Sequence, residues 1–170
     1  MPKGLKETSS LIGIGFGTTE TAANTFTQER VDLQLNPLDN EVFIVYAIDL
    51  DPLAPDVVAG SNTATSCSLT TTSRTSVVSL SDSACLANKV LNIRMAAGSV
   101  EGVPFSRGSN ESPATQLEYI GIISTNDFFV QVQGSNNTGA KAVTGKVYGV
   151  RARADASVYA ALVQSEVLTQ

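Results

Sequence analysis

One stretch constrains the fold of this chain more than any other: the ten residues from Glu41 to Leu50, which form its densest apolar run. Seven of the ten are β-branched, aromatic or leucine, and acidic residues lie near both ends of the run. An extended segment of this length, at ~3.3 Å per residue, crosses a whole small domain. The run therefore predicts a central strand that is covered on both faces.

The composition favours an all-β protein. The chain has 170 residues, of which 42% are hydrophobic and only 16% charged. A chain of this length is expected to form one domain with one core, without help from a metal or a disulfide. Ser, Thr, Asn and Gly are abundant while the helix formers Glu, Lys and Gln are sparse, which is typical of strands joined by polar turns.

Alternating and β-branched segments predict about eight strands. Between Gln28 and Asn36 the residues Val31, Leu33 and Leu35 alternate with polar residues, as in a half-buried strand. Low hydrophobicity places a predicted hairpin of residues 64–72 and 75–81 toward a sheet edge, and residues 98–115 are expected to form a long loop. The other predicted strands cover residues 89–96, 116–124, 127–133 and 142–153.

Residues 1–26 are predicted to be an extended N-terminal arm, followed by a single domain over residues 27–170. The arm carries Leu11, Ile12, Ile14 and Phe16 and is expected to add to a sheet edge, either its own or that of a neighbouring subunit. Gly13, Gly15 and Gly17 alternate in the arm, but no preceding strand, following helix or Lys-Ser/Thr pair accompanies them. A nucleotide-binding loop is therefore not expected there.

The end of the chain predicts a short helix over residues 155–168, with Asp155 as its N-cap. The residues Val158, Tyr159, Leu162, Val163 and Val167 fall on one stripe at helical spacing. A helix of this length is marginal on its own, so the stripe must dock on another surface. That surface is either the chain's own sandwich or a neighbouring subunit.

The residue types argue against catalysis and cofactor binding. The chain has no histidine, which excludes Ser-His-Asp and Cys-His arrangements. Cys67 and Cys85 are too few for a zinc site, and their pairing is left open. The acids Asp49, Asp51 and Asp56 lack the spacing of a calcium loop. We expect no metal, no cofactor and no enzyme activity, although a carboxylate pair serving a glycosidase remains an alternative.

Charge and hydropathy also limit the partners. The net charge of −5 supplies no broad cationic field, so contact with nucleic acid is expected to be at most indirect. No apolar run of about eighteen residues is present to span a membrane, and Met-Pro-Lys-Gly is not followed by the apolar region of a secretory signal.

The predicted architecture is an eight-stranded antiparallel β-sandwich or jelly roll with an extended N-terminal arm and a short C-terminal helix. The chain resembles the single jelly-roll capsid proteins of icosahedral viruses. The features that carry the resemblance are the Gly/Thr-rich arm (Leu11 to Phe16), the strands of Val31 to Leu35 and Glu41 to Leu50, the long polar loops and the low charge. The resemblance covers residues 28–153 by architecture and implies a subunit that repeats into a shell. The arm departs from many small coat proteins in having no Arg-rich segment.

We therefore expect a structural, self-assembling protein, a viral coat subunit of a virion that assembles in the host cytoplasm. Its partners would be copies of itself, with a second structural protein as an open possibility. The expected interface residues are Leu11, Ile12, Ile14, Phe16, Arg107, Arg151, Arg153, Tyr159, Leu162 and Val163. The arginines, with Arg94, would pair with carboxylates such as Asp49, Asp51 and Glu101 and set the register between copies. The alternative is a carbohydrate- or ligand-binding β-sandwich module, although the chain has no Trp.

Overall fold

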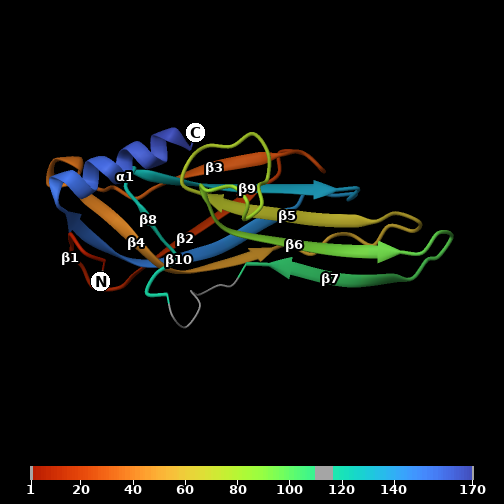
Figure 1. The fold of residues 1–170 in the computed structure, drawn as a ribbon. Coiled ribbons are helices and arrows are strands. Elements are labelled where there is room, and N and C mark those ends of the chain that lie inside the picture. The colour runs from red at the N-terminus through yellow and green to blue at the C-terminus, as the bar shows by residue number, and fades with distance from the viewer. Residues whose placement is uncertain (1, 110–116, 170) are drawn as a thin grey trace.

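The computed structural model describes residues 2–109 and 117–169 as a two-layer β-sandwich with one helix (Figure 1). All strand pairs are antiparallel, which confirms the predicted all-β sandwich with a short C-terminal helix. In chain order the elements are β1 (Leu5–Glu7), β2 (Ile12–Thr19), β3 (Thr27–Asp32), the 3-10 helix η1 (Pro37–Asp39), β4 (Glu41–Pro52), β5 (Thr63–Thr70), β6 (Cys85–Met95), β7 (Gly102–Gly108), β8 (Gly121–Ile123), β9 (Asp127–Ser135), β10 (Ala142–Ala154) and α1 (Ala156–Leu168).

The strand order is that of a jelly roll. In sheet A, β10 lies between β4 and the consecutive pair β1 and β2, and β8 completes the sheet beside β4. In sheet B the order is β3-β9-β5-β6-β7. The pairs β5 with β6, β4 with β8, β3 with β9 and β2 with β10 are nested within one another, as in one long hairpin rolled into two layers. The strands β1 and β7 are additions to this set of eight.

The predicted central strand is confirmed as β4, which is buried on both faces. Phe43 and Val45 pack in the main core between the two sheets, while Val42 and Ile44 belong to a second cluster on the opposite face of sheet A. All four side chains are at most 1% exposed. Two clusters on the two faces of one strand require the continuous apolar run from which the fold was predicted.

The C-terminal helix covers the second cluster. Val158, Tyr159 and Leu162 of α1 pack against Val150 and Ala152 of β10, and the helix runs along one side of the sandwich (Figure 1). Of the two docking surfaces that the sequence left open, the structure therefore places the helix on its own sandwich. No helix in the described ranges is long and apolar enough to cross a membrane.

The predicted hairpin of residues 64–72 and 75–81 is wrong in its second half. Only Thr63–Thr70 is a strand, and residues 71–84 form an irregular connection. The strand β5 is also not at an edge, because it lies between β9 and β6. Three of its polar side chains are hydrogen-bonded in this position: the hydroxyl groups of Thr63 and Thr70 donate to the Asp56 and Thr72 carbonyls, and the Ser68 hydroxyl donates to Gln131 Oε1 at 2.6 Å.

Several other boundaries differ from the prediction. The strand predicted over residues 116–124 is the short β8, and β6 begins at Cys85 rather than at residue 89. Residues 102–108, expected within a loop, form β7 and pair with β6. The loop expectation for residues 110–115 lies outside the described residues. The predicted strand of residues 28–36 ends at Asp32, since Gln34 adopts a φ of 54° that breaks the ladder, yet Leu33 and Leu35 remain buried.

Candidate functional site

The strands β6 and β7 form a hairpin that projects at one end of the sandwich (Figure 1). All 7 residues of β7 are exposed, and Val103 and Phe105 are each 56% exposed. On the same face, the register sets Asn92 opposite Phe105 and Arg94 opposite Val103. We call this face the hairpin surface; it consists of Val90, Asn92, Arg94, Val103, Phe105 and Arg107.

The hairpin surface faces away from sheet A. Val90 of the hairpin surface lies opposite Ser66 of β5. The next residue of β5, Cys67, belongs to the main core, so Ser66 and Val90 lie on the outer face. Arg107 lies at one end of the surface and lines an open groove of about 430 Å³ together with Asn88 and Gln133. An apolar centre beside two arginines is typical of the exposed patches that proteins use for contact with a partner.

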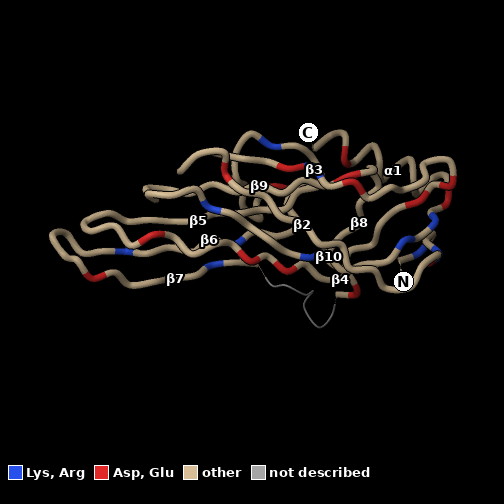
Figure 2. Tube along the Cα trace, turned by 180° about the vertical axis from the view of Figure 1, so that it is seen from behind, with Lys and Arg blue, Asp and Glu red and all other residues tan. Residues whose placement is uncertain are grey.

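Charged residues of both signs lie elsewhere on the sandwich, several of them near the N-terminus (Figure 2). The exposed acids Asp49 and Asp51 lie on β4, and Glu29 lies on β3. Acidic and basic residues are scattered over the trace rather than gathered in one field. A contact between copies that joins the hairpin surface to one of these acids would therefore depend on a few specific pairs.

The four predicted residues of the arm lie on or beside β2, which pairs with β10 of the same chain. Ile14 and Phe16 pack against the main core, and the Phe16 ring meets Phe128 edge to face with centroids 5.8 Å apart. Ile12 is half-buried, and Leu11 is 63% exposed. The arm therefore takes the sheet edge of its own chain, and Leu11, just before β2, remains exposed.

Two of the predicted arginines have partners within the chain. Arg151 donates from Nη1 to the Gln34 carbonyl at 2.9 Å and from Nη2 to the Leu33 carbonyl at 2.8 Å, and its Nη1 lies 3.3 Å from Glu41 Oε2. Arg153 Nη2 lies 2.9 Å from Asp39 Oδ1, and this pair is exposed. Arg151 thus anchors the segment that follows β3, while Arg107 keeps an exposed position at the hairpin surface.

The predicted helix residues point in different directions. Tyr159 and Leu162 pack on the second cluster, and Val163 is half-buried. Val167 and Leu168 are 53% and 76% exposed. The described structure thus brings Tyr159 and Leu162 to one place but sets them apart from Phe16 and Arg107, which lie on β2 and β7.

Sequence reasoning missed the polar contacts that hold the end of α1. Arg74 Nη2 donates to the Thr169 carbonyl at 2.6 Å. Arg74 also forms a bidentate ion pair with Asp82, in which Nε donates to Oδ2 at 2.7 Å and Nη2 donates to Oδ1 at 2.9 Å. The Glu166 carboxylate accepts from the backbone N–H groups of Ser124 and Thr125 at 2.7 and 3.0 Å. The only sequence signal for Arg74 is its isolation as a basic residue within a Ser/Thr-rich run.

A network of buried and half-buried polar groups joins three loops at one end of the sandwich. Asp56 accepts from Lys141 Nζ at 2.6 Å and from the N–H groups of Thr138 and Gly139. The hydrogen bond from Lys141 is the main reason why the pKa of Asp56 lies well below its usual range. Glu20, which is 4% exposed, accepts from the backbone N–H groups of Gly134 and Lys141. All these acceptors already have donors, which argues for a structural role.

The two cysteines are free thiols, Cys67 buried and Cys85 partly buried. Burial raises the pKa of Cys67 to about 12 and that of Cys85 to about 11. Thiols with such pKa values are protonated at neutral pH and are poor nucleophiles. The arrangement therefore gives neither cysteine the activation that a nucleophile needs.

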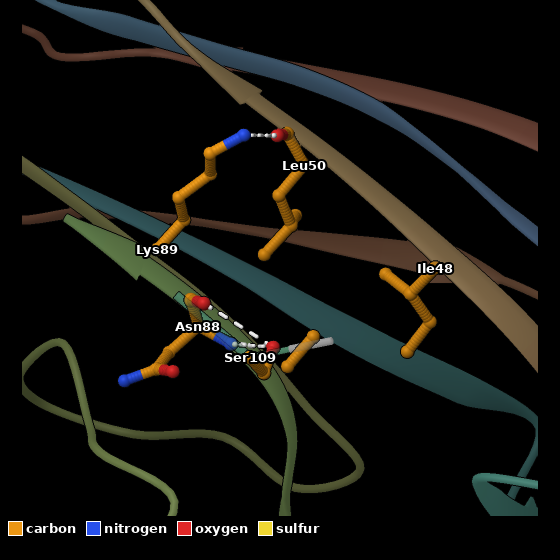
Figure 3. A pocket seen from close by; sticks show the side chains of 6 residues that line it. Ile48, Leu50, Asn88, Lys89 and Ser109 are labelled. Carbon is orange, nitrogen blue, oxygen red and sulfur yellow. Dashed lines mark hydrogen bonds between the residues drawn. The ribbon is translucent and has the colours of Figure 1, made fainter. Parts of the chain in front are cut away.

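The described residues provide little space for a buried ligand. Between the sheets, Ile48, Leu50, Asn88, Lys89 and Ser109 surround a cavity of about 30 Å³, and Lys89 Nζ donates across it to the Leu50 carbonyl at 3.3 Å (Figure 3). A cavity of this volume holds about one water molecule. Within residues 2–109 and 117–169, no group of three or more His, Cys, Asp or Glu side chains could hold a metal ion.

A weak likeness to this chain is found among solved structures. No protein-family model matches the chain, and no curated protein matches it. A solved structure of Desmodium yellow mottle tymovirus is similar with a TM-score of 0.32 and 12% identity, over 92% of this chain and 96% of that chain. A TM-score of this size carries no argument, so the fold assignment rests on the nested strand pairs described above.

Proposed function

We propose that this protein is a structural subunit that assembles with copies of itself, and specifically that it is a coat protein of an icosahedral virion. The observation that carries the proposal is the hairpin surface, where Val103, Phe105 and the two arginines lie exposed on a projecting hairpin. The jelly-roll topology agrees with the proposal, because this fold is frequent in viral capsid domains, although fold alone does not decide function.

The distribution of exposed apolar side chains supports assembly. Val100, at the tip of the hairpin, is 76% exposed, and Leu53 and Val57, in the connection after β4, are 52% and 67% exposed. Burying such side chains between copies contributes free energy in proportion to the apolar area removed from water, at about 25 cal/mol per Å². Uncharged Ser and Thr around them are cheap to desolvate compared with charged residues.

In this role the chain acts without catalysis, and its mechanism is the burial of surface between neighbours. Arg94 and Arg107 would pair with exposed acids of another copy, such as Asp49 or Asp51, and set the register of the contact. The partners are further copies and, in the wider form of the proposal, a second structural protein. The site of action is the virion, with assembly in the host cytoplasm.

A ligand-binding module is the second candidate, and a specific groove favours it. The half-buried Phe129 lies beside Thr72, Ser73, Asn126 and Asp127 at an open groove of about 380 Å³. An aromatic ring among hydroxyl and carboxylate groups suits a sugar ring. Asp127 is already paired with Arg30 at 2.6 Å, which weakens its capacity to bind a sugar.

The size of the purified protein distinguishes the two candidates. Assembly predicts particles far larger than the 17.8 kDa chain in sedimentation velocity and in electron micrographs, with a fraction that grows with concentration. A monomer at all concentrations, together with binding of oligosaccharides that Phe129→Ala abolishes, would support the module and contradict the coat proposal.

A further inference from the structure

The four outer edges of the two sheets differ in how they are protected from pairing. An edge strand presents unpaired N–H and C=O groups, and proteins protect such edges with short strands, charged residues or proline. In the described residues, β8 is only 3 residues long and β3 carries Glu29, Arg30 and Asp32. The edges formed by β8 and β3 are therefore protected.

The edge strand β7 is protected by Pro104. Ser109 N donates to the Asn88 carbonyl at 2.9 Å, which fixes the alternation of hydrogen-bonded pairs along β6 and β7. By this alternation the backbone of Phe105 faces β6 and the nitrogen of Pro104 faces outward. A proline at that position removes the donor that a further strand would need.

The edge strand β2 has none of these protections. It is 8 residues long, and the sequence from Leu11 to Thr19 contains neither a charged residue nor a proline. Glu20 N donates to the Lys141 carbonyl at 2.8 Å, so the alternation turns the N–H and C=O groups of Gly13, Gly15 and Gly17 away from β10. No other described strand pairs with β2 on that side.

We propose that β2 pairs antiparallel with β2 of a second copy, centred on Gly15, so that the two sheets A become one continuous sheet. The inference rests on the proposed function and deepens it by naming a contact surface. In this register Gly15 of one copy lies opposite Gly15 of the other, and Gly13 lies opposite Gly17. Each such pair exchanges two backbone hydrogen bonds across the edge.

The pattern of β2 identifies a second copy as the partner. A two-fold contact sets the central residue opposite its own symmetry mate, which brings like charges together wherever a charged residue lies at or near the axis. Because β2 is uncharged, it avoids this repulsion. The two-fold axis also sets the half-buried Ile14 beside Phe16 of the other copy. Both side chains lie on the face of β2 that packs on the main core, so apolar side chains continue from one copy to the other across the contact.

The size of the contact fits a subunit with several neighbours. Eight residues span about 27 Å of sheet edge, which buries less than the ~800 Å² per partner of a stable isolated interface. The β2 contact is therefore expected to act together with other contacts, such as those of the hairpin surface. A dimer held by β2 alone would dissociate readily.

Substitutions at Gly15 test the pairing without disturbing the folded subunit. An added Cβ at Gly15 meets no atom within 4 Å, and its φ is not positive. G15P removes only an outward N–H, and G15K places two lysines opposite each other. G15A keeps the donor and serves as the matched control, while S106P makes the same change on β7, whose edge already carries a proline.

The expected result is that G15P and G15K lose the particle peak in sedimentation velocity, while G15A and S106P assemble like the wild type and all variants keep the circular dichroism of the wild type. If the wild type forms particles and folded G15K forms them equally well, the β2 pairing is overturned and the proposed function stands. If the wild type stays monomeric at every concentration, the proposed function is overturned and the pairing with it.

A cross-link tests the register independently. Facing Cα atoms in a hydrogen-bonded antiparallel pair lie about 5.5 Å apart, within the range that a disulfide bridges. Mild oxidation of G15C particles should give a dimer on a denaturing gel that reductant reverses, and S106C should give none. Particles of G15C that yield no such dimer would overturn the pairing centred on Gly15.

Discussion

Arg74, in the connection between β5 and β6, donates from Nη2 to the main-chain carbonyl of Thr169 at 2.6 Å, just after the last residue of α1. A cation at the C-terminal end of a helix stabilises its unpaired carbonyl groups. The hydrogen bonds that Arg74 donates to the Asp82 carboxylate lower the pKa of Asp82 and raise the pKa of Arg74. One side chain therefore links a long surface connection to the C-terminal end of α1.

Arg74→Ala should destabilise the protein, because it removes the contact to Thr169 and leaves Asp82 without its partner. We expect a loss of about 2 kcal/mol, which lowers Tm by roughly 4–8 °C in a domain of this size. Thermal unfolding followed by circular dichroism measures the change. The matched control is Arg94→Ala on the exposed face of β6, and equal Tm losses in both variants would contradict the role of Arg74.

Phe105→Thr should reduce assembly without loss of stability. The ring is 56% exposed in the subunit and threonine is a good strand residue, so the free energy of unfolding should change by less than about 0.5 kcal/mol. If Phe105 is buried between copies, the assembly constant should fall by about tenfold or more. Sedimentation velocity measures this, with Leu38→Thr on η1 as the control; unchanged assembly of Phe105→Thr would count against the hairpin surface.

Asp56→Asn should change the pH dependence of stability. The pKa of Asp56 is lowered in the folded protein, so its contribution is fully present above the unfolded pKa of about 3.9 and is lost as the pH falls toward the lower folded value. The Tm difference between wild type and variant should therefore be largest at neutral pH and shrink below about pH 4. A constant difference from pH 7 to pH 3, or the same trend in Glu29→Gln, would argue against this carboxylate.

The two thiols should react only after unfolding. With pKa values of about 12 and 11, Cys67 and Cys85 are almost entirely protonated at pH 8. A thiol-specific chromogenic reagent should label neither within minutes in the native protein and should label both in denaturant. Rapid labelling of two thiols per native chain would contradict the burial described for them.

Gly149→Ala should be far more damaging than Gly15→Ala. A Cβ at Gly149 would overlap the Ile44 carbonyl oxygen and lie 2.6 Å from the Phe43 ring, in the most buried part of sheet A. We expect a loss of about 3 kcal/mol or no accumulation of folded protein. Denaturant unfolding compares the two variants, and similar stabilities would show that the backbone at Gly149 yields to the added methyl group.

The strands that could be predicted are those whose pattern of apolar residues indicates which of their faces are buried. The continuous apolar run around Phe43 predicted a strand buried on both faces, and β4 is buried on both faces. The hairpin surface was missed because Gly102, Pro104 and Gly108 resemble loop residues, although Val103, Phe105 and Arg107 alternate as in a strand. A proline is compatible with an edge strand, but only the pairing with β6 reveals that β7 is one.

The central position of β5 could not be predicted, because it depends on partners far away in the sequence. Gln131 Nε2 donates to Thr70 Oγ1 at 2.7 Å and to Gln28 Oε1 at 2.9 Å, and these contacts satisfy polar groups that would otherwise favour solvent. The expected interface residues could not be sorted from the sequence either, because their exposure depends on distant partners. Arg151 and Arg153 have the same appearance in the sequence as Arg107, yet only Arg107 lies at the hairpin surface.

The position of β10 between β4 and β2 has a consequence for folding during synthesis on the ribosome. The most apolar strand emerges from the ribosome roughly 100 residues before the strand that must cover its backbone, and contacts of such long sequence separation form slowly. During synthesis, β4 therefore lacks its long partner strand until residues 142–154 have been made, and it needs shielding from aggregation in that interval. Premature termination before residue 142 would release a chain that cannot close either the sheet or the core.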